Sequence, residues 1–211
     1  MFRRLVIVSI LVLCFGACLH EAAVPFAYAG LEDAKAAYDR GDYETAFNEF
    51  KALAEEGNIE SQYNVGMMYY NGRGVFYKDY NEALKWFRKA AEKEFPRAQY
   101  SLGVMYMKGE GVPKDNAEAV KWYRKAADQE LADAQYNLGM MYGLGQGVSK
   151  DLVQAHMWFD LAAEQGDSEA QRDKDKVARE MTKSQIAEAQ RLAKQWKPKT
   201  KDYGLPDSFS R

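Results

Sequence analysis

Apolar residues recur along most of the chain with the spacing of amphipathic helices. The clearest run, at positions i, i+4, i+7 and i+8, consists of Ala98, Leu102, Met105 and Tyr106. After a short glycine-containing loop, a narrower stripe follows at Ala119, Tyr123, Ala126 and Ala127. The pattern predicts two helices joined by a turn, in which small residues on one helix face large residues on the next.

This two-helix pattern repeats. Successive units begin at Ser61, Ala98, Ala134 and Ala170, at steps of 37, 36 and 36 residues. The extra residue of the first step falls in a loop, where insertions leave the helix register intact. We predict three full helix pairs at 59–95, 96–131 and 132–167. A divergent pair over 30–58 precedes them, and a closing pair over 168–197 and a flexible tail over 198–211 follow.

The glycine-rich segment between the two helices of each unit is interpreted as a corner. It reads NGRGV, KGEGV and LGQGV in the three units. A phosphate-binding loop would follow a strand and carry GxGxxG or GxxxxGK[ST], whereas this segment follows a helix and has neither motif. The first glycine of each corner is expected to end the helix in the left-handed conformation: Gly72, Gly109 and Gly145.

An aspartate then begins the second helix of each unit. We expect these residues to act as N-caps that each contribute about 1 kcal/mol: Asp79, Asp115 and Asp151. Three residues later stand Glu82, Glu118 and Gln154, so the pattern predicts three capping boxes. Thr182 and Gln185 predict a fourth box at the start of the last helix.

Each first helix also contains an internal glycine, at Gly66, Gly103 and Gly139. Such a glycine costs about 1 kcal/mol relative to alanine in a helix. Its recurrence therefore predicts that a neighbouring helix approaches too closely to leave room for a Cβ atom.

The first 29 residues are predicted to be a secretory signal. Arg3 and Arg4 precede an apolar run from Leu5 to Leu19, which is shorter than the ~20 residues that span a bilayer. Ala27-Tyr28-Ala29 supplies small residues for cleavage between Ala29 and Gly30. The chain is therefore expected in the periplasm or outside the cell, with no membrane insertion after cleavage. As an alternative, Phe15 to Cys18 resembles a lipobox, which would anchor the protein through acylated Cys18.

The composition argues against several kinds of functional site. Both cysteines, Cys14 and Cys18, lie in the predicted signal, so the mature chain would have no disulfide, thiolate zinc site or thiol nucleophile. Residues 30–171 carry 16 basic and 24 acidic side chains, which does not favour a nucleic-acid partner. His156, the single histidine beyond the signal, is interpreted as a surface or packing residue. We therefore expect no catalytic residues, no metal and no cofactor.

The combined pattern A-x-x-L-G-x-x-Y-x-x-G-x-G-V-x-x-D-x-x-x-A-x-x-W-x-x-x-A-A resembles the Sel1-like repeat (SLR), a relative of the tetratricopeptide repeat. The resemblance covers about residues 61–170. It implies an all-α fold, a right-handed α-solenoid superhelix of antiparallel helix pairs whose concave face is lined by the first helices. It also implies a non-catalytic scaffold, expected as a monomer, that binds another protein or peptide.

The resemblance further implies which residues line the concave groove: Met67, Tyr70, Asn71, Val104, Met107, Lys108, Met140, Gly143 and Leu144. Two rival functions stay open. One is a soluble or lipid-anchored component of envelope assembly. The other is a β-lactam-binding or β-lactam-hydrolysing enzyme, an activity once attributed to exported members of the family; no residue pattern in this chain supports it.

Overall fold

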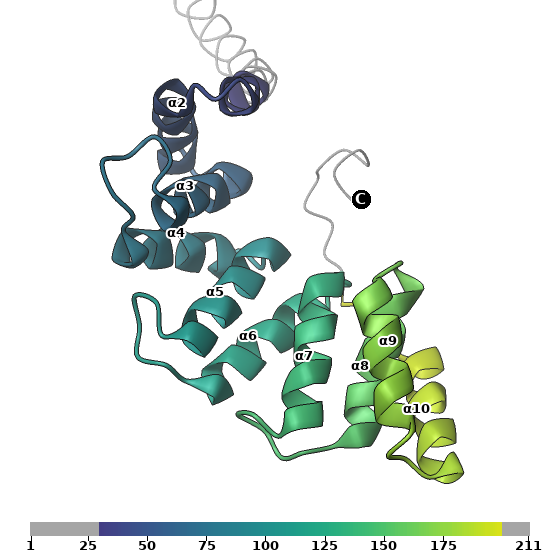
Figure 1. Ribbon diagram of the computed structural model, residues 1–211. Helices are drawn as coiled ribbons and strands as arrows, with labels where there is room; N and C mark the ends of the chain where they lie inside the picture. The colour runs from purple at the N-terminus through teal and green to yellow at the C-terminus, as the bar shows by residue number, and fades with distance from the viewer. Residues whose placement is uncertain (1–29, 200–211) are drawn as a thin grey trace, which may run out of the picture. The chain divides into compact units, whose positions relative to one another are not determined.

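The computed structural model describes residues 30–199 (Figure 1), and within this range the chain forms helices and no β-strand. The predicted signal 1–29, including Ala29 and the alternative Cys18 anchor, lies outside the described residues, as does the chain from residue 200 onward. The described chain divides after Asp79 into two compact units. This boundary falls inside the first full repeat, between its two helices.

The first unit holds a helix over residues 30–39, α2 (Tyr43–Glu55) and α3 (Ile59–Asn71). Polar side chains begin these helices as N-caps. Asp42 accepts a hydrogen bond from the Thr45 N–H at 3.3 Å, and Asn58 accepts one from the Ser61 N–H at 2.8 Å. The core of the unit consists of buried apolar residues from all three helices: Leu31, Ala34, Ala37, Ala46, Phe47, Phe50, Ala54, Val65 and Met68.

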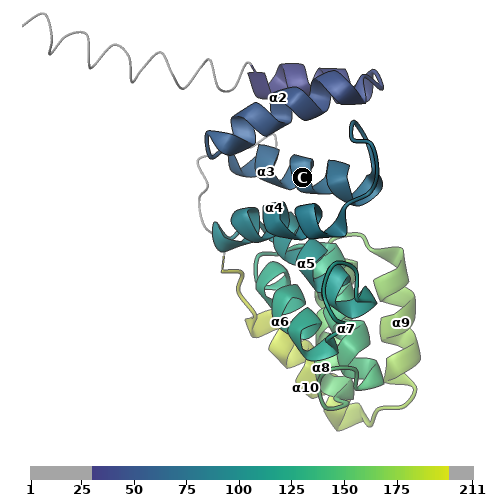
Figure 2. The same cartoon turned by 90° about the vertical axis from the view of Figure 1, so that its left-hand side faces the viewer.

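The described part of the second unit forms seven helices. They are α4 (Tyr80–Glu92), α5 (Pro96–Lys108), α6 (Asn116–Ala127), α7 (Ala132–Leu144), α8 (Leu152–Glu164), α9 (Ser168–Ala178) and α10 (Lys183–Gln195). Within a repeat, α5 packs on α6 and α7 on α8; between repeats, α4 packs on α5, α6 on α7 and α8 on α9 (Figure 2). The helices α5 to α8 thus each bury one side within their own repeat and another side against a neighbouring repeat.

The predicted turn chemistry forms the corners. Gly72, Gly109 and Gly145 are left-handed C-caps, with φ of 73°, 79° and 69°. Asp115 and Asp151 each cap two N–H groups of the following helix at 2.9 and 3.0 Å. The second half of the predicted box is not seen at Glu118, whose carboxylate pairs with Lys121 instead. Thr182 and Gln185 form the complete box.

A second corner glycine holds consecutive repeats together. At Gly147, where φ is 69°, an added Cβ would lie 2.2 Å from the Asn116 carbonyl oxygen at the start of α6. Gly111 lies against the Tyr80 carbonyl oxygen at the start of α4 in the same way, with a distance of 2.7 Å. Each corner therefore rests on the first turn of the previous repeat's second helix, and only a residue without a side chain permits that approach.

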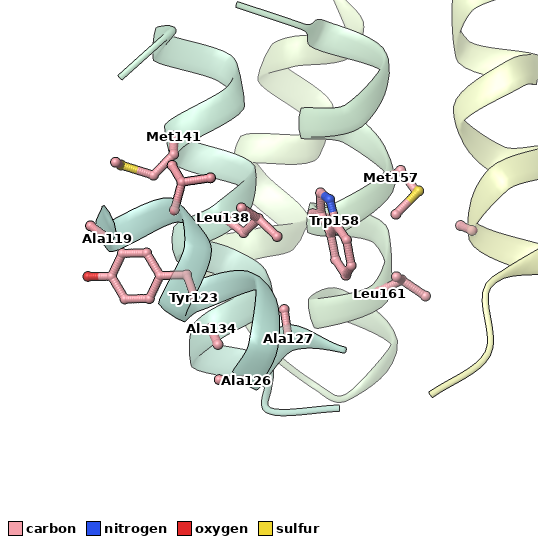
Figure 3. Packing of buried hydrophobic residues seen from close by; sticks show 12 residues of the cluster. Ala119, Tyr123, Ala126, Ala127, Ala134, Leu138, Met141, Met157, Trp158 and Leu161 are labelled. Atoms are coloured by element: carbon pink, nitrogen blue, oxygen red, sulfur yellow. The ribbon is translucent and has the colours of Figure 1, made fainter. Parts of the chain in front are cut away.

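The buried side chains of α6, α7 and α8 form one continuous layer (Figure 3). It joins Tyr123 from α6, Leu138 from α7 and Trp158 from α8, each at most 2% exposed. No helix of this amphipathic type could bury its apolar stripe alone, so the repeats depend on one another for their stability.

This packing explains two of the three internal glycines, Gly103 and Gly139, as predicted. A Cβ at Gly103 would lie 2.6 Å from the ring of Tyr123, and one at Gly139 would lie 2.7 Å from the ring of Phe159. Both rings belong to the second helix of the same repeat and are fully buried. The close neighbour is therefore the partner helix within the repeat.

The closing pair departs from the repeated arrangement. We predicted α9 and α10 as a terminal helix pair, yet α10 packs against α8 rather than against α9. Ala193, Leu192 and Trp196 join the layer around Trp158, and the Trp158 and Trp196 rings meet edge to face at 6.1 Å. Helix α10 therefore covers an apolar face of α8 that the sequence pattern did not assign to it.

Candidate protein-binding surface

The nine predicted groove positions all lie on the first helices of the repeats. None is fully buried. Half-buried positions are Met67, Tyr70, Val104, Met107, Met140 and Gly143, and exposed ones are Asn71, Lys108 and Leu144. Among the apolar groove positions Leu144 is the most exposed, with 59% of its surface accessible.

Several of these side chains also stabilise the fold. Val104 and Met107 pack against the layer formed by α6, α7 and α8, and the Tyr123 hydroxyl lies 3.7 Å from the Met107 sulfur. Met140 packs against Phe159 and its neighbours in α8 and α9. The methionines therefore present only part of their surface, and the most accessible predicted residues of the second unit are Lys108 and Leu144.

A row of tyrosine hydrogen bonds holds the first helices side by side. Asn137 on α7 donates to the Tyr100 hydroxyl on α5 at 3.2 Å, and the Tyr136 hydroxyl on α7 donates to Asp173 on α9 at 3.0 Å. Burial and the hydrogen bond to Asp173 raise the pKa of Tyr136 to about 12. These bonds fix the spacing of α5, α7 and α9, and our sequence analysis missed them.

Buried glutamines also link successive repeats. Gln135 is fully buried; its side-chain amide donates to the Ala127 carbonyl at the end of α6 at 3.3 Å, and its oxygen accepts from Gln165 at 2.8 Å. Gln99 repeats the arrangement, with bonds to Ala91 and Gln129. The signal available in the sequence was the recurrence of glutamine at Gln62, Gln99 and Gln135, one position after each opening small residue.

A hollow of about 170 Å³, lined by both apolar and charged residues, lies beside Leu144, where α7, α8 and α9 meet. Its lining joins three predicted groove positions to residues that were not predicted: Met140, Gly143, Leu144, Lys150, Leu152, Phe159, Asp173, Lys176, Val177 and Glu180. A further step of 36 residues from Met140 and Leu144 leads to Lys176 and Glu180, so the repeat period could have identified them.

The chemistry of the described residues is limited. Residues 30–199 contain no cluster of three or more histidine, cysteine or acidic side chains that could hold a metal ion. His156, interpreted as a surface or packing residue, is a packing residue with 3% of its surface exposed. Burial lowers its pKa below the usual value, an effect that the Asp160 carboxylate partly opposes. No helix in residues 30–199 is long and apolar enough to cross a membrane.

Stacked helix pairs with a row of accessible side chains on the first helices define an α-solenoid repeat protein. The family model described as the Sel1 repeat matches residues 59–95, 96–131 and 132–167, which is about half of the chain. The protein belongs to the Sel1 repeat family. Sel1 repeats typically mediate protein–protein interaction, and the family is generally non-catalytic.

Solved structures agree with this assignment. A protective antigen present in uropathogenic Escherichia coli strains, described as displaying an SLR fold, is 33% identical with a TM-score of 0.74; the match covers 83% of this chain and 38% of that one. A Sel1 repeat protein from Oxalobacter formigenes is 38% identical with a TM-score of 0.65, covering 68% and 59%. This chain thus spans less than two thirds of either protein. A comparison with curated sequences found no match.

Proposed function

We propose that this protein is a non-catalytic interaction module that binds a protein or peptide on the concave face formed by its first helices. The observation that carries the proposal is the accessible row on α5 and α7, where Lys108 and Leu144 are exposed beside half-buried Val104, Met107 and Met140. Methionine-rich, partly exposed apolar surface adapts well to a peptide or an amphipathic helix. The typical role of Sel1 repeats supports this reading.

The test is a binding experiment with a double variant, Lys108→Glu with Leu144→Asp. Both side chains are exposed, so the substitutions change the surface and leave the core intact. We expect capture of a partner from the native cell envelope to fall at least tenfold, while far-UV circular dichroism stays unchanged. The matched control is Lys89→Glu with Lys125→Glu on the second helices α4 and α6, which should bind normally. Equal capture by both double variants would refute the proposal.

We also propose that the protein acts after export, with residues 1–29 removed as a signal sequence and Gly30 at the mature N-terminus. The support is the apolar run from Leu5 to Leu19 and the Ala27-Tyr28-Ala29 site. Mass spectrometry of the native protein tests this directly. A free Gly30 amine would support a soluble exported protein, acylated Cys18 would instead indicate an anchored one, and an intact residue 1 would refute export by either route.

A further inference from the structure

The hollow beside Leu144 exists because one repeat position has lost its side chain. This position holds Tyr70 in the first repeat, Met107 in the second and Gly143 in the third. In the second repeat, Met107 reaches across to the ring of Tyr123, with its sulfur 3.7 Å from the hydroxyl. In the third repeat, glycine leaves that space empty, and Phe159 replaces Tyr123.

The empty space is accessible and has an apolar wall with a charged rim. Phe159, Leu152 and Val177 line it, and a Cβ added at Gly143 would make only an ordinary contact of 3.7 Å, with the Ala155 Cβ. A volume of about 170 Å³ is comparable with the apolar cavities of about 150 Å³ that accept benzene-sized molecules. The hollow therefore has room for one large apolar side chain, of the kind that Met107 supplies from within the chain one repeat earlier.

Some of the charged side chains around the hollow have partners within the chain, and one has none among residues 30–199. Asp173 accepts the Tyr136 hydrogen bond at 3.0 Å, and Glu180 lies 3.6 Å from Lys150. Lys176 is exposed and forms no ion pair with any residue of 30–199. Both carboxylates are thus occupied by groups of this chain, and the ammonium group of Lys176 is the charge left for a ligand.

We propose that the hollow is an anchor site for a protein segment that presents one large apolar side chain, leucine, methionine or phenylalanine, within two residues of an aspartate or glutamate. The apolar side chain fills the place that Met107 occupies one repeat earlier, and the neighbouring carboxylate pairs with Lys176. This inference rests on the proposed function, because it specifies which partner the same surface selects.

The experiment screens an array of immobilised dodecamer peptides of random sequence against the intact chain, followed by fluorescence titration of the best binders. We expect enrichment of peptides with a large apolar residue next to or two residues from an acidic one. Gly143→Met, which fills the hollow as Met107 does, should weaken their binding at least tenfold. The matched control Gly143→Ala adds a single methyl group that makes only an ordinary contact with the Ala155 Cβ, and should bind within twofold of the native chain.

A second variant tests the charge independently of the fold of α7. Lys176→Glu should reverse the preference, so that peptides with lysine or arginine beside the apolar residue replace the acidic ones. Lys125→Glu on α6 makes the same change away from the hollow and should leave the preference as it is. Unaltered circular dichroism spectra confirm that each variant is folded.

The failures of the two proposals are distinguishable. If no peptide class is enriched, or if binding is indifferent to both Gly143→Met and Lys176→Glu, the anchor site is refuted. Peptide binding that neither of these two substitutions affects could still be lost in the Lys108→Glu, Leu144→Asp variant. In that case the proposed function would stand and the anchor site would not. The chain's own residues 200–211 place Leu205 two residues before Asp207. A chain ending at Lys199 that binds peptides more tightly would identify this segment as the occupant, and would overturn the proposal of a separate partner.

Discussion

At the scale of the residue, two glycines of the same helix have opposite environments. Gly139 faces the ring of Phe159, which would lie 2.7 Å from an added Cβ, whereas the nearest atom to a Cβ at Gly143 is 3.7 Å away. Alanine improves helix propensity by about 1 kcal/mol at either site. Only at Gly139 does it also force a buried ring to move, and overpacking of this kind costs about 1–3 kcal/mol.

We therefore predict that Gly139→Ala lowers the free energy of unfolding by up to about 2 kcal/mol, measured by urea denaturation. Gly143→Ala serves as the control and should leave it unchanged or raise it by up to ~1 kcal/mol. Equal effects of the two substitutions would show that the close helix approach is not what requires Gly139.

His156 provides a test that depends on pH. It occupies the position of buried Leu84 and Val120 in the earlier repeats, and its neighbours Asp160, Lys174 and Asp175 set the local charge. Burial lowers its pKa in the folded state, so below pH 6.5 the unfolded chain binds a proton that the folded chain resists. The stability linked to His156 is therefore present at neutral pH and is lost as the pH falls.

We predict that His156→Val gains stability relative to the native chain as the pH is lowered from 7.5 to 5, in urea titrations at both values. Val120→Leu, an apolar exchange at the equivalent buried position of the second repeat, should show no such pH-dependent difference. A His156→Val effect that is the same at both pH values would contradict a buried, neutral imidazole.

Much of this residue-scale chemistry was predictable, and the rest was not, for identifiable reasons. Local sequence determines the left-handed conformation of the corner glycines and the helix cap at Asp151. Both predictions were confirmed. Gln135 looks like a surface residue by type, and its burial follows only from the helix end that it meets in space. The burial of His156 could have been predicted from its place in the repeat. The apolar residues Leu84 and Val120 occupy the same position in the earlier repeats, and both are buried.

At the scale of the element, the start of each second helix depends on one carboxylate. Asp151 accepts hydrogen bonds from the Val153 and Gln154 N–H groups at 2.9 and 3.0 Å. We predict that Asp151→Ala lowers the free energy of unfolding by about 1 kcal/mol, because both N–H groups lose their partner. Hydrogen exchange should accelerate at the amides of Val153 and Gln154.

Asp151→Asn is the matched control, because asparagine caps a helix about as well as aspartate does. It should preserve both stability and amide protection. If the asparagine variant loses as much stability as the alanine variant, the contribution of Asp151 is its charge and not its hydrogen bonds.

The hydrophobic periodicity predicted where the helices form, but it did not predict which helix α10 packs against. The pattern indicated a closing pair over 168–197, and α9 and α10 do form there. The stripe of Ala189, Leu192, Ala193 and Trp196 does not by itself say which neighbour it covers. It packs on α8, because Met157, Trp158 and Leu161 present a large apolar face on that side. Such a choice depends on three-dimensional neighbours and not on local pattern.

At the scale of the whole molecule, the fold class could be predicted from the repeat. Once one unit is assigned as a helix pair, the units with the same pattern are assigned in the same way. The nine groove positions follow from the resemblance to related repeats, and the structure leaves all of them at least partly accessible. The hollow at Gly143 was hidden, because it arises from a side chain that is missing in one repeat and from the closing helix α9 beside it. Sequence periodicity describes what repeats share, whereas a binding site depends on where the repeats differ.

The central claim is that the first helices, and not the second, carry the partner. The most direct test places a photo-crosslinking amino acid, p-benzoylphenylalanine, at Leu144 on α7 or at Lys125 on α6, and irradiates living cells that produce the protein. We predict a discrete crosslinked partner from position 144 and none from position 125, which is also exposed to solvent. A partner captured through position 125 and not through 144 would contradict the account.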